Sequence, residues 1–232
     1  MKRIIVITAL LTVLLQAYAQ NIEGSITIKA RENILTKLPE QAAYLLPAFT
    51  DAVVTGRDGS LSSGRVNVCL VDNSVRFITD SGDTLLMSNA ENVSRIVFAD
   101  TVLLQVQDYF VKQMVVYGQK SIAERRQLKL TQQAESAGYS SIPAVSTAKK
   151  GTMVALDPTY VYEAETDYDY RMTTDLVLTD GTEVYSAKLS SFVKVFPDRK
   201  KEIRSFVKEH RTDFNDKQDL AELFFFCIEE QN

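Results

Sequence analysis

The sequence is poor in the residues that most often build enzyme and metal sites. Its 232 residues include no tryptophan, two cysteines and a single histidine, His210. Sugar-binding proteins often stack aromatic rings, tryptophan above all, on their ligands, so its absence counts against that class. A zinc site built from several histidines is excluded, because only one histidine is present.

The remaining catalytic motifs are also missing. His210 lies between Glu209 and Arg211 at the end of a charged helical segment, where a solvent-facing cation is favoured. The chain has no Gly-x-Ser-x-Gly elbow, and residues 118–121 lack the spacing of a phosphate loop. Ser-x-x-Lys occurs three times, but the companion motifs of serine acyl-transfer enzymes are absent. The sequence therefore predicts no catalytic residue, no metal site and no cofactor.

Positive charge is not in excess either. The formal net charge is −4 at pH 7. Nucleic acids and anionic membrane surfaces bind basic faces, so neither is an expected partner. The late apolar run at residues 224–228 is far shorter than the roughly 20 residues that span a bilayer.

The N-terminus has the three parts of a secretory signal peptide in order. Lys2 and Arg3 precede an apolar run from residue 4 to 15, and residues 17–19 read Ala-Tyr-Ala, a small-x-small cleavage site. We expect residues 1–19 to be removed and Gln20 to be the new N-terminus, which changes the net charge from −4 to −6. No cysteine follows the cleavage site, so the sequence predicts an exported protein, periplasmic or extracellular, that is not a lipoprotein.

The two cysteines leave one alternative open. An oxidising compartment permits a bridge between Cys69 and Cys227. Cys69 lies in an apolar strand pattern, however, and Cys227 lies on the apolar side of a late helical pattern. Because cysteine is among the most buried residue types, two free buried thiols are the favoured interpretation.

The first half of the mature chain reads as short strands joined by turns. Ile26 and Ile28 are typical of an edge strand, and Asp-Gly at 58–59 is typical of a tight turn. Gln107 and Asp108 break the longest apolar pattern, and residues 121–133 are ambiguous between helix and strand, with strand favoured. Such close spacing predicts an antiparallel meander. The expected strands cover residues 44–49, 52–54, 66–71, 75–79, 84–88, 93–98, 102–117 and 121–133.

The second half changes from strand to helix. Two strands, 160–165 and 168–179, are expected around a short acidic link, and Asp180-Gly181 joins the latter to 183–185 as a hairpin. Helices are expected at 189–196, from Pro197 to about residue 210, and over 220–228 after a cap at Asn215 or Asp216. The sequence thus predicts an α+β fold, an antiparallel β-meander forming a small barrel or sandwich, with a C-terminal pair or trio of helices.

The expected organisation has four parts. A β-rich part at residues 20–137 follows the signal peptide at 1–19. Residues 138–151, rich in Ser, Ala and Gly, are a loop or linker. Residues 152–232 hold the hairpin and the C-terminal helices, which we expect to pack on the same core.

Several segments together carry a resemblance. The first is Tyr-Leu-Leu-Pro-Ala-Phe at 44–49, with Asp-Gly at 58–59. The second is Arg-Arg-Gln-Leu-Lys-Leu at 125–130, with Gly-Tyr-Ser-Ser at 138–141. The third is Phe-Val-Lys-Val-Phe-Pro-Asp at 192–198, which is followed by a Lys-rich helix, Phe-Asn-Asp at 214–216 and the last helix. The chain resembles a widespread group of exported, uncharacterised proteins of Gram-negative bacteria. The resemblance covers most of the mature chain and implies export, but no activity and no site residues.

The most distinctive local pattern is an acidic, tyrosine-rich stretch at residues 160–170. In an extended chain its acids lie on one side and its tyrosines on the other. Clustered carboxylates suit calcium, but the stretch lacks the glycine of a calcium loop. A bend at 166–167, with tyrosines half-buried and acids in water, is favoured over a binding site. The candidate binding residues are Tyr160, Tyr162, Tyr168, Tyr170, Glu163, Glu165, Asp167 and Asp169.

Two functions remain from the sequence. The first is an exported, non-enzymatic protein that binds an unknown protein or glycan partner, or belongs to the cell envelope. The alternative is a hydrolase acting through the acidic, tyrosine-rich hairpin at 160–170. A deep pocket with two converging carboxylates near Glu163 to Asp169 favours the hydrolase, and a flat or convex surface there favours the binding protein.

Overall fold

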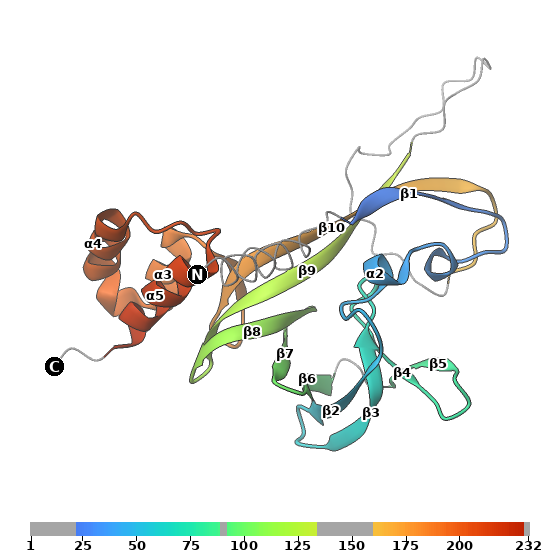
Figure 1. Cartoon of the computed structure of the whole chain (residues 1–232), viewed down its shortest axis with the longest axis horizontal. Helices are drawn as coiled ribbons and strands as arrows, with labels where there is room; N and C mark the ends of the chain where they lie inside the picture. Colours follow the sequence, from blue (N-terminus) through green and yellow to red (C-terminus); the bar gives the residue numbers. More distant parts are fainter. Residues whose placement is uncertain (1–21, 89–91, 134–159, 230–232) are drawn as a thin grey trace, which may run out of the picture.

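The computed structural model describes residues 22–88, 92–133 and 160–229 (Figure 1). The expected signal peptide at 1–19 and the expected linker at 138–151 lie outside these residues. Within the described ranges, no helix combines the length and the apolarity that crossing a bilayer requires.

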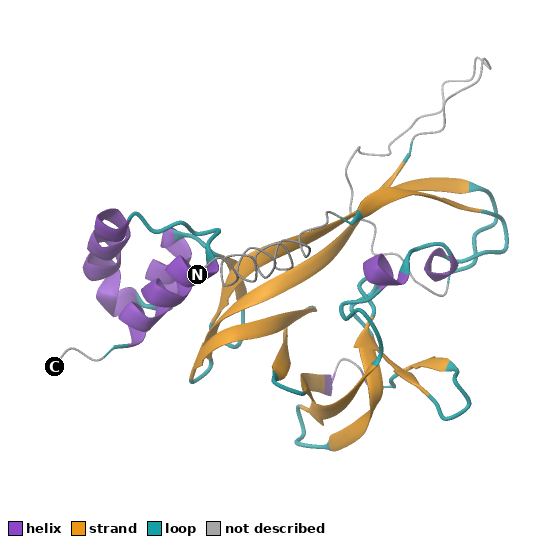
Figure 2. Cartoon of the chain, in the orientation of Figure 1, coloured by secondary structure: helices purple, strands orange, loops and turns teal. Residues whose placement is uncertain are grey.

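The described strands form one antiparallel sheet with helices at the C-terminal end, an α+β fold (Figure 2). The strand order is β1-β10-β9-β8-β7-β6-β2-β3-β4-β5, and β11 pairs with β10. The strands are β1 (Glu23–Ile28), β2 (Thr50–Gly56), β3 (Leu61–Val68), β4 (Val75–Ile78), β5 (Thr84–Leu86), β6 (Val93–Phe98), β7 (Thr101–Val106), β8 (Tyr109–Tyr117), β9 (Lys120–Gln132), β10 (Thr166–Thr179) and β11 (Val184–Ser186).

The sheet is open, so the expected barrel is wrong. Eleven strands of the described chain belong to one sheet rather than to two stacked ones, and its ends, β1 and β5, do not pair with each other. Closure needs every strand to have two neighbours, whereas here the two end strands lie far apart in the strand order. The long strands β9 and β10 connect the strand-rich part to the helices (Figure 1).

The buried side chains form two large groups. The strand cluster includes Ile28, Ile96, Leu128 and Met172, and the helix cluster includes Ile122, Leu178, Phe192, Leu223 and Phe224. On β10 and β9 the members of both clusters occupy even-numbered positions, and alternate residues of a strand share a face. Both clusters therefore cover the same face of the β9–β10 ladder, at its two ends. Val106, Val111, Ala123 and Val177 form a small cluster on the opposite face.

Side-chain hydrogen bonds mark both ends of the last C-terminal helix, α5. Asp216 caps α5, since its carboxylate accepts the N–H groups of Gln218 and Asp219 at 2.8 and 3.0 Å. Arg199 donates to the carbonyl oxygens of Phe226 and Glu229 at the other end of α5. α5 packs against β8 and β9, and α3 packs against β10. The helical elements here are α3 (Leu189–Val195), η3 (Pro197–Arg199), α4 (Lys200–His210) and α5 (Lys217–Ile228).

Residues 38–49 differ from the sequence-based expectation. The expected strand at 44–49 is absent, and only Tyr44 makes an isolated bridge, to Cys69. The segment instead begins with the short helix α2 (Glu40–Ala43), which follows η1 (Ile34–Thr36). Leu38, Ala42, Ala43 and Leu45 are buried in the strand cluster, so the segment covers the sheet rather than joining it.

Candidate binding groove

The acidic, tyrosine-rich stretch is not a hairpin. β10 begins at Thr166 and runs without a bend to Thr179, and residues 160–165 form no strand, so the strand expected there is wrong. Tyr162 instead exchanges backbone hydrogen bonds with the turn after β1, accepting from Arg31 N–H at 2.8 Å and donating to Glu32 C=O at 3.0 Å. The stretch therefore closes the end of the strand cluster.

The tyrosines of this stretch point mainly into the protein. Tyr162 and Tyr168 are buried, their rings meet edge to face, and the Tyr162 hydroxyl donates to the Tyr168 hydroxyl at 3.3 Å. Burial raises the pKa of Tyr162. The Tyr170 hydroxyl lies within 2.8 Å of the position that a Cβ on Gly24 would take. Tyr160 is 51% exposed and packs on Tyr162.

The acids of the stretch lie in water on the other face. Asp167 accepts a hydrogen bond from Thr27, and Asp169 accepts from Ser25 and Gln133, at 2.5 to 2.8 Å. These bonds from Ser25 and Gln133 hold the pKa of Asp169 below its usual range. Glu163 and Glu165 are exposed. The described residues contain no group of three or more His, Cys, Asp or Glu side chains placed to hold a metal ion.

Both cysteines are free and buried. Burial raises the pKa of the Cys69 thiol to about 11 and that of the Cys227 thiol to about 12. Cys227 belongs to the helix cluster, and Cys69 pairs with Tyr44 at the strand-rich end. The two thiols thus occupy different ends of the molecule and stay protonated at neutral pH, which makes them poor nucleophiles.

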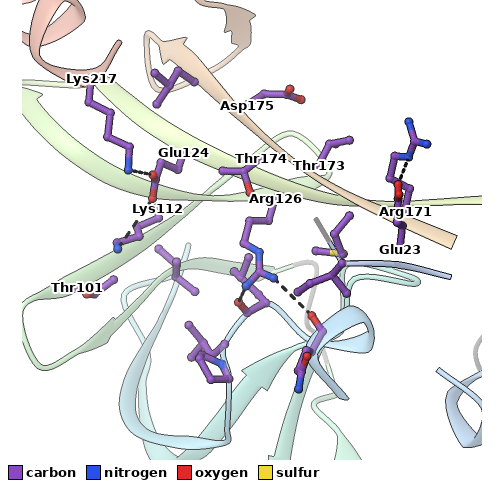
Figure 3. Close-up of a pocket in the computed structure, with 18 of the residues that line it drawn as sticks. Glu23, Thr101, Lys112, Glu124, Arg126, Arg171, Thr173, Thr174, Asp175 and Lys217 are labelled. Atoms are coloured by element: carbon purple, nitrogen blue, oxygen red, sulfur yellow. Dashed lines mark hydrogen bonds and ion pairs between the residues drawn. The ribbon is translucent and has the colours of Figure 1, made fainter. Parts of the chain in front are cut away.

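A groove lies on the sheet between the two clusters (Figure 3). Its floor is the middle of the β9–β10 ladder, where Glu124 pairs with Leu176, and Arg126 with Thr174. One wall is the segment after α2, including Leu45, and the other includes Asn215 and Lys217 at the start of α5. Phe98, Thr101, Leu103 and Lys112 continue the floor across β6, β7 and β8.

Charged side chains of both signs line this groove, and the carboxylates of Glu23 and Asp175 pair with Arg171 and Arg125. Glu124 is the shared partner of Lys112, at 3.9 Å, and of Lys217, which brings α5 against β9. Arg126 has no carboxylate within ion-pair distance among the described residues, and its guanidinium donates to the carbonyl oxygens of Leu45 at 2.7 Å and Gln41 at 3.4 Å. Burial lowers the pKa of Arg126, but arginine remains charged in proteins.

The groove follows a split in the sheet. β8 pairs with β9 only from Lys120 to Glu124, whereas β10 pairs with β9 from Ser121 to Gln132. Beyond Lys112, β8 turns away and pairs with β7 alone. The remaining half of β9, residues 125–132, therefore has a strand on one side only within the described chain.

None of the eight residues singled out in the 160–170 stretch lines this groove. The stretch and the groove share β10, but they lie at different points along it. Sequence patterns indicated the groove only weakly. Glu124 and Arg126 belong to the segment that was ambiguous between helix and strand, and Lys217 was not singled out.

In comparisons with protein-family models, curated proteins and solved structures, the chain shows no match.

Proposed function

We propose that this chain is an exported, non-enzymatic binding protein that holds a partner in the groove between its two clusters. The observation that carries the proposal is the open groove itself, in which charged, hydroxyl and apolar side chains from distant segments line one surface. Binding sites typically combine an apolar floor with a few placed polar groups. Export rests on the signal peptide that the first 19 residues predict.

The chemistry of the groove supports binding over catalysis. General acid–base catalysis needs a group whose pKa lies near the working pH, and nucleophilic catalysis needs a base beside the nucleophile. The three carboxylates that line the groove are all in ion pairs. Glu124 pairs with Lys112 and Lys217, Glu23 with Arg171, and Asp175 with Arg125. The histidine, His210, is stacked on Phe206 in α4 and does not line the groove.

The alternative hydrolase has less support. Asp167 and Asp169 lie on a solvent-facing strand surface and accept hydrogen bonds from neighbouring side chains. A general acid for glycoside cleavage needs a raised pKa, whereas the pKa of Asp169 is lowered. We therefore propose no reaction for this chain.

The test is site-specific photo-crosslinking in the native envelope. A photoreactive amino acid replaces Thr101 or Asn215 on the two sides of the groove, and Lys129 on the opposite face of β9 is the control position. We expect a discrete crosslinked product from both groove positions and none from the control. Intact mass of the same sample should show that residues 1–19 have been removed.

Two results would contradict the proposal. One is equal crosslinking from the groove and the control position, or no crosslinking from either groove position. The other is turnover of a glycoside, ester or peptide by the purified protein that disappears in Asp169→Asn, which would favour the hydrolase.

A further inference from the structure

We infer that the groove is built for an acidic, extended segment of a partner protein, which lies along the unpaired half of β9. This inference rests on the proposed function and adds the chemical class of the partner. Three features of the described residues support it, namely the charge of the floor, the free edge of β9 and the apolar side chains between the charges.

The charge of the floor is opposite to that of the whole chain. Two lining carboxylates, Glu23 and Asp175, pair with Arg171 and Arg125. Lys112, Arg126 and Lys217 surround the remaining one, Glu124, while the chain as a whole carries −4. A local excess of cations on an acidic protein attracts anionic groups and repels other parts of the same surface. Arg126 is the strongest element, because its half-buried guanidinium donates hydrogen bonds only to carbonyl oxygens and has no carboxylate within ion-pair distance among the described residues.

The free edge of β9 is suited to an extended peptide. In an antiparallel ladder, alternate residues direct their N–H and C=O groups to opposite sides. Gln133 N–H donates to Asp167 C=O, so the odd-numbered residues of β9 bond to β10 and the even-numbered ones face away from it. Within the described chain no strand pairs with that side of β9 between residues 125 and 132. A peptide in strand conformation supplies the missing partners, as in other cases of strand addition.

Apolar side chains separate the charges along the groove. Leu46, Phe98 and Leu176 are half-buried, and Met172 is nearly covered. A segment whose groove-facing residues are acidic and apolar in turn matches this surface, and these residues lie at every second position because alternate side chains of a strand share a face. An acidic polysaccharide matches the charge, but it offers neither the repeating N–H and C=O groups nor the apolar side chains.

The probe is a fluorescein-labelled decapeptide in which Glu and Val take turns at every second position with Ser between them, so that both face the groove; it is titrated into the exported chain by fluorescence anisotropy. Two comparison peptides separate the contribution of charge from that of strand pairing. One has Lys in place of Glu, and the other keeps the Glu content but has two central prolines that prevent strand pairing. We expect binding of the Glu–Val peptide that weakens as salt rises. We expect the Lys–Val and the proline-containing peptides to bind at least about tenfold more weakly.

Matched variants place the peptide in the groove. Lys112→Ala and Lys217→Ala remove cations whose side chains are 51% and 62% exposed, so the fold should be retained. Each should raise the Kd about three- to fivefold, as expected for one partly exposed charge pair. Lys129→Ala, on the opposite face of β9, is the control and should leave the Kd unchanged. Circular dichroism confirms that all three variants are folded.

The outcomes separate this inference from the proposed function. Equal binding of the Glu–Val and Lys–Val peptides, or an equal loss in Lys129→Ala, overturns the inference. Tight binding of polygalacturonate with no binding of the Glu–Val peptide also overturns it, in favour of an acidic glycan. In each of these cases the groove crosslinks can still form, so the proposed function is tested separately, by the crosslinks and by the turnover assay.

Discussion

The two ends of the molecule are assembled in different ways. The helix cluster draws nearly all its buried residues from positions 176–228, with Ile122 and the end of β8 completing it, and it relies on large aromatic rings such as Phe192, Phe196 and Phe224. The strand cluster relies mainly on aliphatic side chains from residues 28–128, closed by Tyr162, Tyr168 and Met172. The helix cluster is therefore formed mainly by residues close together in the sequence, whereas the strand cluster depends on contacts between segments far apart in it.

This difference matters for stability and for the groove. Contacts between distant segments require long loops to close, which costs conformational entropy before the contacts form. In the strand-rich end, Ser25 bonds Asp169 across 144 residues of sequence. The β9–β10 ribbon joins the two ends, so the groove keeps its shape only when both clusters are formed.

The largest expected effect is in the helix cluster. Phe224→Ala removes a fully buried ring that packs edge to face on Phe196, and should lower the free energy of unfolding by about 3–5 kcal/mol. Phe225→Ala, at the next position but 49% exposed, should cost less than about 1 kcal/mol. Denaturant unfolding measures both values. Equal costs would show that α5 is not packed as described.

The thiols extend this test to each end separately. Because Cys227 lies in the helix cluster and Cys69 at the strand-rich end, native-state labelling reports the opening of each. Phe224→Ala should accelerate the labelling of Cys227 more than that of Cys69. Equal acceleration would mean that the two ends unfold as one unit.

The reciprocal change is in the strand cluster. Ile96→Ala empties a fully buried site on β6 and should cost about 2–5 kcal/mol. It should accelerate the labelling of Cys69 more than that of Cys227. Val53→Ala, on the neighbouring strand β2 but 43% exposed, is the matched control with little expected effect. A larger response at Cys227 would contradict the division into two ends.

The smallest expected effect concerns the turn between β10 and β11. Desolvation opposes the charge of Asp180, but hydrogen bonds from Glu183 and Thr182 N–H and from the Thr182 and Tyr185 hydroxyls outweigh it and lower the pKa of Asp180 from 3.8 to about 2. Asp180→Asn should therefore cost about 1 kcal/mol at neutral pH.

The lowered pKa of Asp180 determines in which direction the stability changes with pH. The folded-state pKa is depressed, so the contribution of Asp180 is complete above about pH 4 and is lost as the pH falls toward about 2. Unfolding free energies measured across that range should fall more steeply for the wild type than for Asp180→Asn. Asp108→Asn, at an exposed turn position, should follow the wild type. Identical slopes for the wild type and Asp180→Asn would contradict the assignment.

The elements predicted from local signals agree well with the structure. Asp-Gly turns occur at Gly59 and Gly181, where φ is +81° and +92°, and Gln107 breaks the long strand pattern with φ of +54°. The strand over 121–133, the edge strand at Ile26 and Ile28, and the C-terminal helices were predicted to within a few residues. These features depend on turn chemistry, alternation and helical spacing, which act over a few residues.

The candidate site was predicted less well. Alternation in residues 166–170 correctly separates acids from tyrosines, but it does not show that Tyr162 and Tyr168 are buried or that residues 160–165 bond to the turn at 31–32. The groove escaped prediction altogether, because its lining comes from segments between residues 22 and 217 that no short-range pattern connects.

Except at residues 44–49 and 160–165, the sequence alone therefore determined where strands, turns and helices form, because propensity, capping and periodicity are encoded within a few residues. Only the tertiary structure decided that the sheet stays open, that β8 leaves β9 after Glu124, and that Arg126 meets the carbonyl oxygens of Leu45 and Gln41. Those outcomes depend on which distant segments reach each other. Register and packing between such segments are set by the joint burial of side chains from many elements, which no single stretch of the chain specifies.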